Sequence, residues 1–353
     1  MDKYYKHGLI IGKFLPFHKG HHAMIDYASR RCDKLTVIVL GHVGEMFSLE
    51  KRERWLKNTY STPKAFENRW IEQLKGNRSN DCRIIIKSYM YDENVLDSSS
   101  ESNINSSKQW CDALSDFIKD IDVIIGSEDY VRYMGEYSHK DYLIYNKERD
   151  IVSISATEIR KDPIKYWDYL MPSVKTEIAC HICICGTESS GKTTLATKLE
   201  KDFEYVTMIP EIGRCLVGNA NTCDVDKLLQ VLDIHKRLLK DVINDPPTPI
   251  VVWDTDNYTT ISYLKHFFNY DYYKSCPTAN IYWFLENDIK YEKDITRINE
   301  EEAKALKESH IQILRDYNID FDILKHSRLN EFAKEQCIQC INNIKKVFGV
   351  LKT

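Results

Sequence analysis

Two short stretches of the 353-residue chain carry residues whose types and spacing suit phosphate chemistry. Near the N-terminus, GKFLPFHKGHH brings three histidines close together: His18, His21 and His22. Further along, GTESSGKT, from Gly186 to Thr193, matches the pattern G-x-x-x-x-G-K-[ST] in full. Histidines at this density bind a metal, bind a phosphate or transfer protons. The second pattern is typical of a loop that surrounds the phosphates of a nucleotide.

The context of GTESSGKT supports this interpretation, because an apolar strand-like run precedes it and a helical segment follows. Glycines let consecutive backbone N–H groups surround an anion, and the helix N-terminus adds partial positive charge. We expect Lys192 to bridge the β- and γ-phosphates of ATP and the Thr193 hydroxyl to hold Mg²⁺. The residues expected to bind phosphate here are Gly186, Glu188, Ser189, Ser190, Gly191, Thr193 and Thr194.

Charged residues follow the next predicted strands of this half. IVVWDTD ends in acids, and Asp254 is expected to orient Mg²⁺ or, alternatively, to cap the following helix. MIPEIGR places Glu211 and Arg214 where α/β sheets bind substrate. Glu211 is either the base for a substrate hydroxyl or a plain loop charge. The charged segment LENDIKYEKDITRINEE carries Arg297, either on a solvated helix or in a lid over the transferred phosphoryl group.

The histidine-rich stretch is typical of a strand, a turn and the start of a helix near His18. His18 and His21 are three residues apart, so they share one face of the first turn and can converge on a phosphate with the free backbone N–H groups. A zinc site is the competing interpretation, since His18 and His22 are four apart. Lys19 stands where a zinc-protease helix carries glutamate, so charge favours an anion. His22 is expected to be a packing or surface residue.

Strand-like and helix-like segments alternate along the whole chain, which predicts parallel α/β sheets with right-handed crossovers. We predict two domains, 1–172 and 173–353, because complete α/β units lie on both sides of a proline-containing segment at 162–177. Residues 96–108 are polar and serine-rich and predict a surface loop. The apolar runs that predict strands are 8–12, 34–40, 83–88, 122–126, 181–186, 249–253, 280–285 and 321–324.

Composition is typical of a globular protein, with 43% hydrophobic and 29% charged residues. The formal net charge of −4 gives no general attraction to nucleic acid. The sequence contains no apolar run of about 20 residues, as a membrane helix needs, and no signal peptide. We therefore expect a cytoplasmic protein that binds neither nucleic acid nor membrane.

Eleven cysteines raise the question of a zinc site. Cys180, Cys183 and Cys185 lie in EIACHICICG, an apolar run typical of a buried strand, so residues 180 and 183 should point to opposite faces. Cys337 and Cys340 are three residues apart on a predicted helix. Small buried thiols are the favoured interpretation, and the odd count fits a reducing compartment better than a disulfide framework.

Two motifs at opposite ends of the first half carry a family resemblance. FLPFHKGHH resembles the H-x-G-H signature of the nucleotidyltransferase superfamily of adenylyl- and cytidylyltransferases, and ISATEIR resembles its second signature, I-S-x-T-x-x-R. SATE is also an ordinary capping box between Ser155 and Glu158, and both interpretations can hold together. The resemblance implies that the following residues bind ATP or its phosphates: Gly12, Lys13, Phe14, Gly20, Ser155, Thr157 and Arg160.

A nucleotidyltransferase half followed by a P-loop half resembles the NadR family of bifunctional nicotinamide-nucleotide adenylyltransferases and ribosylnicotinamide kinases, from about residue 8 to 348. The resemblance implies that Arg52, Trp110, Arg214 and Asp256 bind nicotinamide mononucleotide (NMN) or the riboside. Trp110 is equally well explained as a core residue. Some family members carry an N-terminal helix-turn-helix domain, but only seven residues precede Gly8, so DNA binding is not implied.

The resemblance further implies ATP as co-substrate, Mg²⁺ as cofactor, and nicotinamide riboside, NMN and NAD as the other small molecules bound. His18, His21, Lys192, Glu211, Asp254 and Arg297 are the expected catalytic residues, and relatives suggest a homo-oligomer. Two other functions stay open: a nucleotidyltransferase for another phosphorylated small molecule fused to its own kinase, and an NAD- or ATP-sensing regulator.

Overall fold

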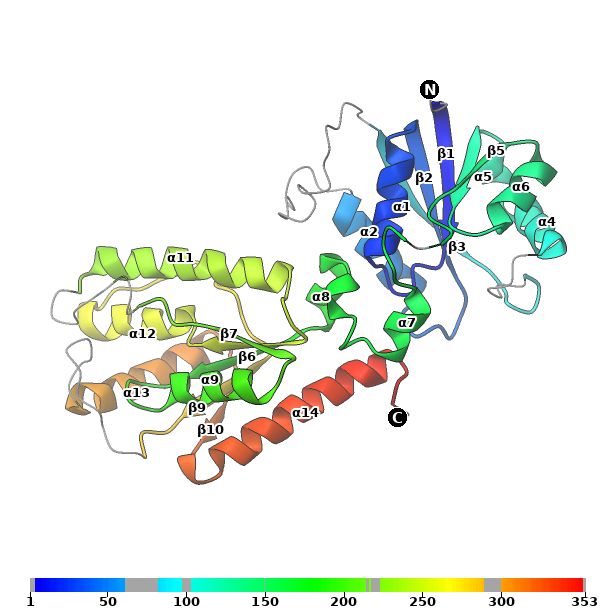
Figure 1. Cartoon of the computed structure of the whole chain (residues 1–353). Helices are drawn as coiled ribbons and strands as arrows, with labels where there is room; N and C mark the ends of the chain where they lie inside the picture. The colour runs from blue at the N-terminus through cyan, green and yellow to red at the C-terminus, as the bar shows by residue number, and fades with distance from the viewer. Residues whose placement is uncertain are drawn as a thin grey trace. The chain divides into compact units, whose positions relative to one another are not determined.

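The computed structural model describes residues 4–60, 82–96, 103–148, 150–213, 216, 223–288 and 300–351. The chain forms two compact units, Met1–Val174 with Val347–Thr353, and Lys175–Lys346. Within the described residues, each unit contains one five-stranded sheet whose paired strands all run parallel (Figure 1).

The first unit has the strand order β3-β2-β1-β4-β5. Its described elements are β1 (Tyr5–Gly12), α1 (Lys19–Ser29), β2 (Cys32–Gly41), α2 (Leu49–Tyr60), β3 (Arg83–Met90), α4 (Ile104–Ala113), α5 (Ser115–Ile118), β4 (Val123–Gly126), α6 (Tyr130–Ser138), β5 (Asp141–Ile144), α7 (Ala156–Lys161) and η1 (Trp167–Tyr169). Helix α8 (Pro172–Ile178) contains the residues at which this unit ends and the next begins.

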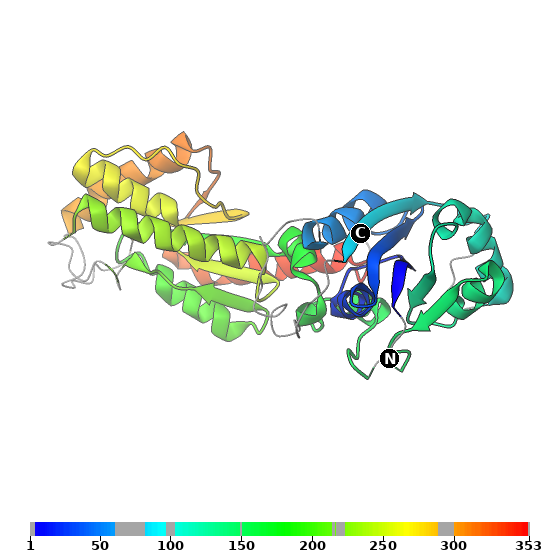
Figure 2. The same ribbon diagram turned by 90° about the horizontal axis from the view of Figure 1, so that it is seen from above.

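Alternation along β1 explains the layers of this unit. Leu9 and Ile11 belong to a core formed with α4, α5 and α6, whereas the next residue, Ile10, is also fully buried and points to the opposite face. Figures 1 and 2 show α1 and α2 on that other side of the sheet. Both faces are therefore covered, as parallel sheets require.

The second unit has the strand order β10-β9-β6-β8-β7. Its described elements are β6 (Cys180–Cys185), α9 (Lys192–Asp202), β7 (Val206–Ile209), α11 (Val225–Asn244), β8 (Ile250–Asp254), α12 (Asn257–Phe268), β9 (Ile281–Leu285), α13 (Glu300–Asp316), β10 (Asp322–Leu324), η3 (His326–Arg328) and α14 (Leu329–Val347).

The two faces of this second sheet are also buried by different helices. Cys183, Cys185 and Trp253 pack with side chains of α11, α12 and α13. On the opposite face, Trp283 contacts Phe332 of α14, with ring centroids 5.9 Å apart. None of the described helices combines the length and the apolar character that a membrane span needs.

The sequence-based fold prediction is confirmed, and the eight predicted strands correspond to eight observed ones. Two observed strands, β5 and β7, are not among these eight. Each has four residues and lies at an edge of its sheet, and DYLI of β5 is only half-buried. The predicted loop at 96–108 is wrong in its second part. Asn103 caps α4 by accepting a hydrogen bond from the backbone N–H of Ser106, so helix begins inside that polar stretch.

Candidate functional site

The first unit has a pocket at the carboxyl edge of its sheet, between β1 and β4. These neighbouring strands lie where the order reverses, since β2 and β3 continue from β1 on one side and β5 continues from β4 on the other. Open α/β sheets bind ligands at such points. The pocket is lined by the start of α1, the loop after β4 and the start of α7, with side chains that include His18, His21, Ser127, Glu128, Ser155 and Thr157.

His18 is the N-cap of α1, and its ring has a defined hydrogen-bonding role. The Nδ1 atom accepts a hydrogen bond of 3.1 Å from the backbone N–H of Gly20. A neutral ring that accepts at Nδ1 carries its proton on Nε2. His18 therefore presents an N–H donor without needing a positive charge. Gly20 is required beside it, because a Cβ atom there would lie 2.9 Å from Cε1 of the His18 ring.

His21 lies directly against His18, with ring centroids 3.8 Å apart, as their shared helix face predicts. Phe14 supports the His21 ring from behind at 4.9 Å and is itself 1% exposed. Phe14 has a φ of 49°, a left-handed conformation that is costly for an aromatic residue. The predicted phosphate-binding residues Gly12 and Phe14 thus lie behind the histidine pair rather than in the pocket lining.

His22 is a packing residue, which was one of the two predicted roles. It is 3% exposed, and its Nδ1 atom lies 2.7 Å from the hydroxyl of Tyr60. The two rings stack with centroids 5.7 Å apart. His22 therefore fixes α1 against the end of α2.

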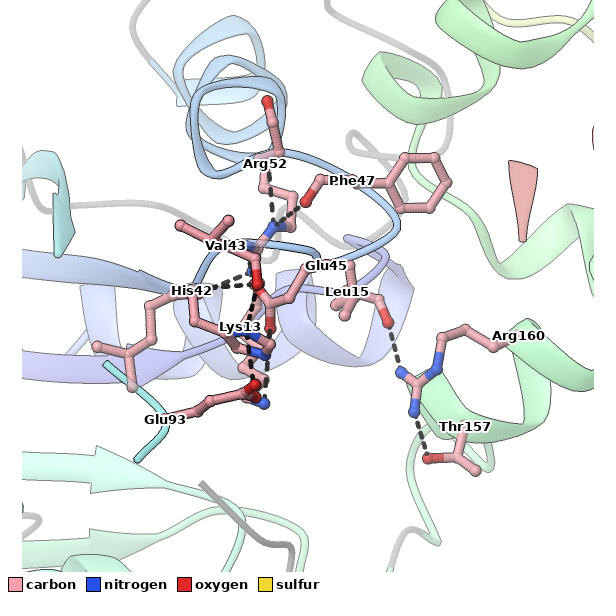
Figure 3. Close-up of polar contacts among 12 residues, drawn as sticks. Lys13, Leu15, His42, Val43, Glu45, Phe47, Arg52, Glu93, Thr157 and Arg160 are labelled. Carbon is pink, nitrogen blue, oxygen red and sulfur yellow. Dashed lines mark hydrogen bonds and ion pairs between the residues drawn. The ribbon is translucent and has the colours of Figure 1, made fainter. Parts of the chain in front are cut away.

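The ISATEIR segment forms the opposite side of the pocket. Ser155 caps α7 in the predicted capping box: its Oγ accepts from the Glu158 backbone N–H at 3.1 Å, and its own N–H donates to the Glu158 carboxylate at 2.9 Å. Arg160 connects the two signatures, because its guanidinium donates to the carbonyl of Leu15 at 2.6 Å and to Thr157 Oγ1 at 3.0 Å (Figure 3). Arg160 thereby fixes the loop before α1 onto α7.

The side chain of Arg52 is buried among backbone carbonyls and one carboxylate. Its side chain is 0% exposed and donates to the carbonyls of Lys13 at 2.6 Å, Leu40 at 2.7 Å and Phe47 at 3.1 Å (Figure 3). It also forms an ion pair with Glu45, which is likewise buried. Burial lowers the pKa of Arg52, and the Glu45 charge partly compensates. In the structure Arg52 braces the loops that follow β1 and β2. Its predicted contact with substrate phosphate stays a prediction.

Glu45 is a residue that the sequence analysis missed. Besides Arg52, it faces Lys13 Nζ at 3.5 Å and His42 Nε2 at 3.4 Å (Figure 3). His42 in turn lies 3.3 Å from Glu93, which follows β3. The signal in the sequence was GHVGE, in which polar residues directly follow a strand. Lys13, one-third exposed at the end of β1, is thus positioned by a buried carboxylate.

Trp110 is a core residue, the alternative role considered for it. It is 9% exposed on α4 and packs edge-to-face with Tyr91, with centroids 5.0 Å apart. It belongs to the apolar cluster between the sheet and helices α4 to α6. The structure thus gives Trp110 a packing role, and its predicted stacking on a nicotinamide ring stays a prediction.

In the second unit, the predicted phosphate loop connects β6 to α9. Gly186, Ser189 and Gly191 have φ values of 134°, 59° and 80°, which turn the backbone repeatedly through the left-handed region. A Cβ atom at Gly186 would lie 2.8 Å from the carbonyl of Leu285, and one at Gly191 would lie 2.9 Å from Nε2 of His326. Glycine is required at both positions for steric as well as conformational reasons.

The loop brings three predicted catalytic and metal-binding side chains together. Lys192 is 7% exposed, and its Nζ donates to the Thr187 carbonyl at 2.8 Å. Thr193 Oγ1 donates to Asp254 Oδ2 at 2.6 Å. Asp254 is 1% exposed, and its other oxygen, Oδ1, is buried without a hydrogen-bond partner among the described residues. A hydroxyl next to a carboxylate with spare acceptor capacity fits a Mg²⁺ ion.

Other predicted residues of this unit have different surroundings. Glu188 accepts a hydrogen bond of 2.9 Å from Tyr263 of α12, and Ser190 donates to the Thr187 carbonyl at 2.8 Å. Thr194 is exposed on the first turn of α9. Glu211 is half-buried just beyond the end of β7.

Asp256 is 0% exposed and caps α12, accepting hydrogen bonds from the backbone N–H and hydroxyl of Thr259. Burial raises the pKa of Asp256 to about 6, although these hydrogen bonds act in the opposite direction. Asp256 therefore has a capping role in the structure, and its predicted contact with the riboside stays a prediction. Arg214 and Arg297 lie outside the described residues.

A histidine near the phosphate loop also escaped the sequence analysis. His326 follows β10, and its Nδ1 lies 2.5 Å from Asp288, which follows β9. The hydrogen bonds from His326 keep the pKa of Asp288 below its usual value despite partial desolvation. No local motif marks this pair, because 38 positions separate its members.

Comparisons with known proteins agree with this architecture. Residues 9–162 match a family model described as cytidylyltransferase-like, and residues 181–331 match one described as an AAA domain. The chain is 25% identical to the trifunctional NAD biosynthesis/regulator protein NadR of Salmonella typhimurium, in an alignment that covers 97% of this chain and 83% of the relative.

Solved structures show the same fold. A crystal structure of NadR in complex with NR and another in complex with NAD and AMP-PNP each give a TM-score of 0.50, at 18% and 19% sequence identity. The alignment with the NR complex covers 98% of this chain and 97% of the other. The alignment with the NAD and AMP-PNP complex covers 99% of this chain and 98% of the other.

Proposed function

Because this chain is a NadR-like protein, with a cytidylyltransferase-like domain followed by an AAA-type kinase domain, we propose that it makes NAD in two steps. The second domain transfers the γ-phosphoryl group of ATP to the 5′-hydroxyl of nicotinamide riboside, which gives NMN and ADP. The first domain transfers the adenylyl group of another ATP to the NMN phosphate, which gives NAD and pyrophosphate.

The observation that carries the adenylyltransfer step is the His18–His21 pair, which faces the capped start of α7 across one pocket. The NMN phosphate is already an anion at neutral pH, so its attack on the α-phosphorus needs alignment and charge stabilisation rather than a strong base. His18 donates from Nε2 toward the phosphate oxygens, and the N-terminus of α1 adds partial positive charge. Across the pocket, Thr157 supplies a hydroxyl beside the Arg160 guanidinium.

Lys13 is proposed to attract the acceptor phosphate toward this pocket. It is the first residue after β1, on the same strand-to-helix connection as His18. The buried Glu45 carboxylate holds its ammonium group in place, and Arg52 compensates that buried charge. One net positive charge is left for an incoming anion when Glu45, Arg52 and Lys13 are all ionised.

In the kinase domain, Lys192 is proposed to neutralise charge on the β- and γ-phosphates as the P–O bond to the leaving ADP breaks. Thr193 and Asp254 would hold Mg²⁺, which supplies further neutralisation of the phosphate oxygens. Glu211 is proposed to accept the proton of the riboside 5′-hydroxyl. Arg214 is proposed to contact the substrate, and Arg297 is proposed to act from a lid over the transferred phosphoryl group.

The test is a two-substrate assay with the purified full chain. Nicotinamide riboside with Mg-ATP should give NMN and ADP, and then NAD and pyrophosphate. NMN with Mg-ATP should give NAD directly. If the chain adenylylates a different phosphorylated small molecule and leaves NMN unchanged, the proposed substrate is wrong. If it binds ATP and NAD without turnover, the proposal of catalysis is wrong.

A further inference from the structure

Two cysteines from opposite ends of the second unit meet in the structure. Cys180 is the first residue of β6 and Cys340 lies in α14, 160 positions later, yet their Sγ atoms are 3.2 Å apart. Both are free thiols. A disulfide requires a separation of about 2.05 Å, so the sulfurs would need to approach by about 1 Å.

The packing of α14 on the sheet explains this contact. Cys180 projects from the opposite face of β6 to Cys183, as the sequence predicts, and Cys183 is buried under α11 to α13. The face that Cys180 shares is covered by α14, where Phe332 contacts the sheet and Lys334 pairs with Asp202 of α9 at 2.7 Å. The two thiols are therefore held together by the surrounding core and by an ion pair.

Cys180, Cys340 and the nearby Cys337 have different surroundings, and these differences determine how readily each thiol is oxidised. Cys180 is half-buried and Cys340 is 7% exposed. Their Sγ atoms lie within hydrogen-bonding distance, and this contact lowers the pKa of the Cys340 thiol. Thiolates are the nucleophilic form of cysteine. Cys337, one helical turn before Cys340, is 0% exposed, and burial raises its pKa to about 12. Reactivity is therefore concentrated in the pair rather than in the third cysteine.

We propose that Cys180 and Cys340 are a site of reversible oxidation, at which a hydroperoxide converts the two thiols into a disulfide. The Cys340 thiolate attacks one oxygen of hydrogen peroxide, the O–O bond breaks, and water leaves after protonation, which gives a sulfenic acid. The Cys180 sulfur then attacks the Cys340 sulfur, and the S–O bond breaks as the second water leaves with the Cys180 proton. Two thiols and one peroxide give one disulfide and two waters.

The disulfide would be a covalent cross-link between the two ends of the second unit. Cys180 and Cys340 lie five and six positions inside its limits, Lys175 and Lys346. A cross-link that closes so long a loop restricts the unfolded chain more than the folded one. Oxidation should therefore raise the unfolding temperature of this unit, roughly by 5 °C or more.

The test is peptide mapping of the full chain. Reduced protein is exposed to hydrogen peroxide, its remaining thiols are alkylated, and it is digested without reductant. We expect the peptides that contain Cys180 and Cys340 to appear as one linked species that dithiothreitol separates. Cys180→Ser and Cys340→Ser should each abolish the link and the rise in unfolding temperature, whereas Cys337→Ser should retain both.

Two results would overturn the proposal. One is recovery of Cys180 and Cys340 as separate alkylated peptides after peroxide treatment of the wild-type chain. The other is a peroxide-induced link in the wild-type chain that joins Cys337, rather than Cys340, to Cys180. Because the mapping is done on the wild-type chain, it stays decisive even if one of the serine variants folds poorly.

Discussion

Thr193 and Asp254 meet through a hydrogen bond of 2.6 Å, which joins the first turn of α9 to the last residue of β8. The contact brings together two residues that lie 61 positions apart. It arises because β6 and β8 are neighbours in the sheet, with Ile184 paired to Asp254. A phosphate loop and an acidic strand end are thereby placed at one edge.

Asp254→Asn tests this relationship. The substitution retains the shape of the side chain but removes the charge that would hold Mg²⁺, so riboside phosphorylation should fall about 100-fold or more. The dependence on Mg²⁺ should shift to higher concentration. Asp271→Asn is the matched control, because its pair with Lys265 is solvent-exposed and contributes little. Unchanged kinase activity in Asp254→Asn would contradict the proposed role.

Arg52→Met should destabilise the first domain by about 3–5 kcal/mol, because the buried Glu45 carboxylate loses its buried partner and keeps the partly exposed Lys13 as a cation nearby. The measurement is thermal or urea unfolding of the full chain. Arg30→Met removes a partly exposed pair with Asp26 on α1 and should cost less than about 1 kcal/mol. If Arg52→Met instead retained its stability and only raised the KM for NMN, direct phosphate binding would be the correct role.

Gly20→Ala separates catalysis from stability in the histidine pair. Alanine favours helix over glycine by about 1 kcal/mol, so the stability of α1 should not fall through helix propensity. The new Cβ would meet the His18 ring at 2.9 Å and displace it. We expect adenylyltransfer to drop at least 10-fold while riboside phosphorylation is unchanged. Full adenylyltransfer activity would mean that the His18 orientation is not needed.

Acid should destabilise the second domain through three buried histidines. Burial lowers the pKa of His181 and His235 to about 4 and that of His310 to about 3, where the Lys192 charge contributes. The unfolded chain binds protons below its ordinary histidine pKa of 6.5, and the folded chain does so only near 3 to 4. Stability is therefore present above pH 6.5 and falls with pH, by about 1.4 kcal/mol per unit for each histidine.

Asp256 acts in the opposite direction, because its raised pKa lets the folded chain take up a proton near pH 6. Between pH 6 and 4, this gain in stability offsets the loss caused by about one of the three histidines. Unfolding curves between pH 7 and 4.5 should show the loss, and His235→Gln should make it shallower. A stability that is constant down to pH 4.5 would contradict the assignment of neutral buried histidines.

The fold was predictable because its signals are local. Apolar runs such as KLTVIVL mark β2, and SATE marks the cap of α7 through residues only three apart. The phosphate loop and the histidine pair were also local, so the sequence placed their side chains near one another. Edge strand β5 escaped because it buries little.

The sequence alone could not show the roles of side chains whose neighbours in the fold lie far away along the chain. The family resemblance implies that Arg52 binds substrate, yet its side chain lies 0% exposed among carbonyls from three different segments. Trp110 and Asp256 are similar, since burial decides between packing and binding and burial depends on the assembled sheet. Cys180 and Cys340 are another such pair.

The most direct test of the two-step account is His18→Ala supplied with nicotinamide riboside and Mg-ATP, with NMN and NAD separated and quantified. We predict that NMN accumulates at the wild-type rate while NAD formation falls by about 100-fold or more. The reason is that only the first domain loses a group, the His18 ring, that donates a hydrogen bond to the reacting phosphate. Loss of both products in a folded variant, or NAD formation at the wild-type rate, would contradict the assignment of adenylyltransfer to the His18 pocket.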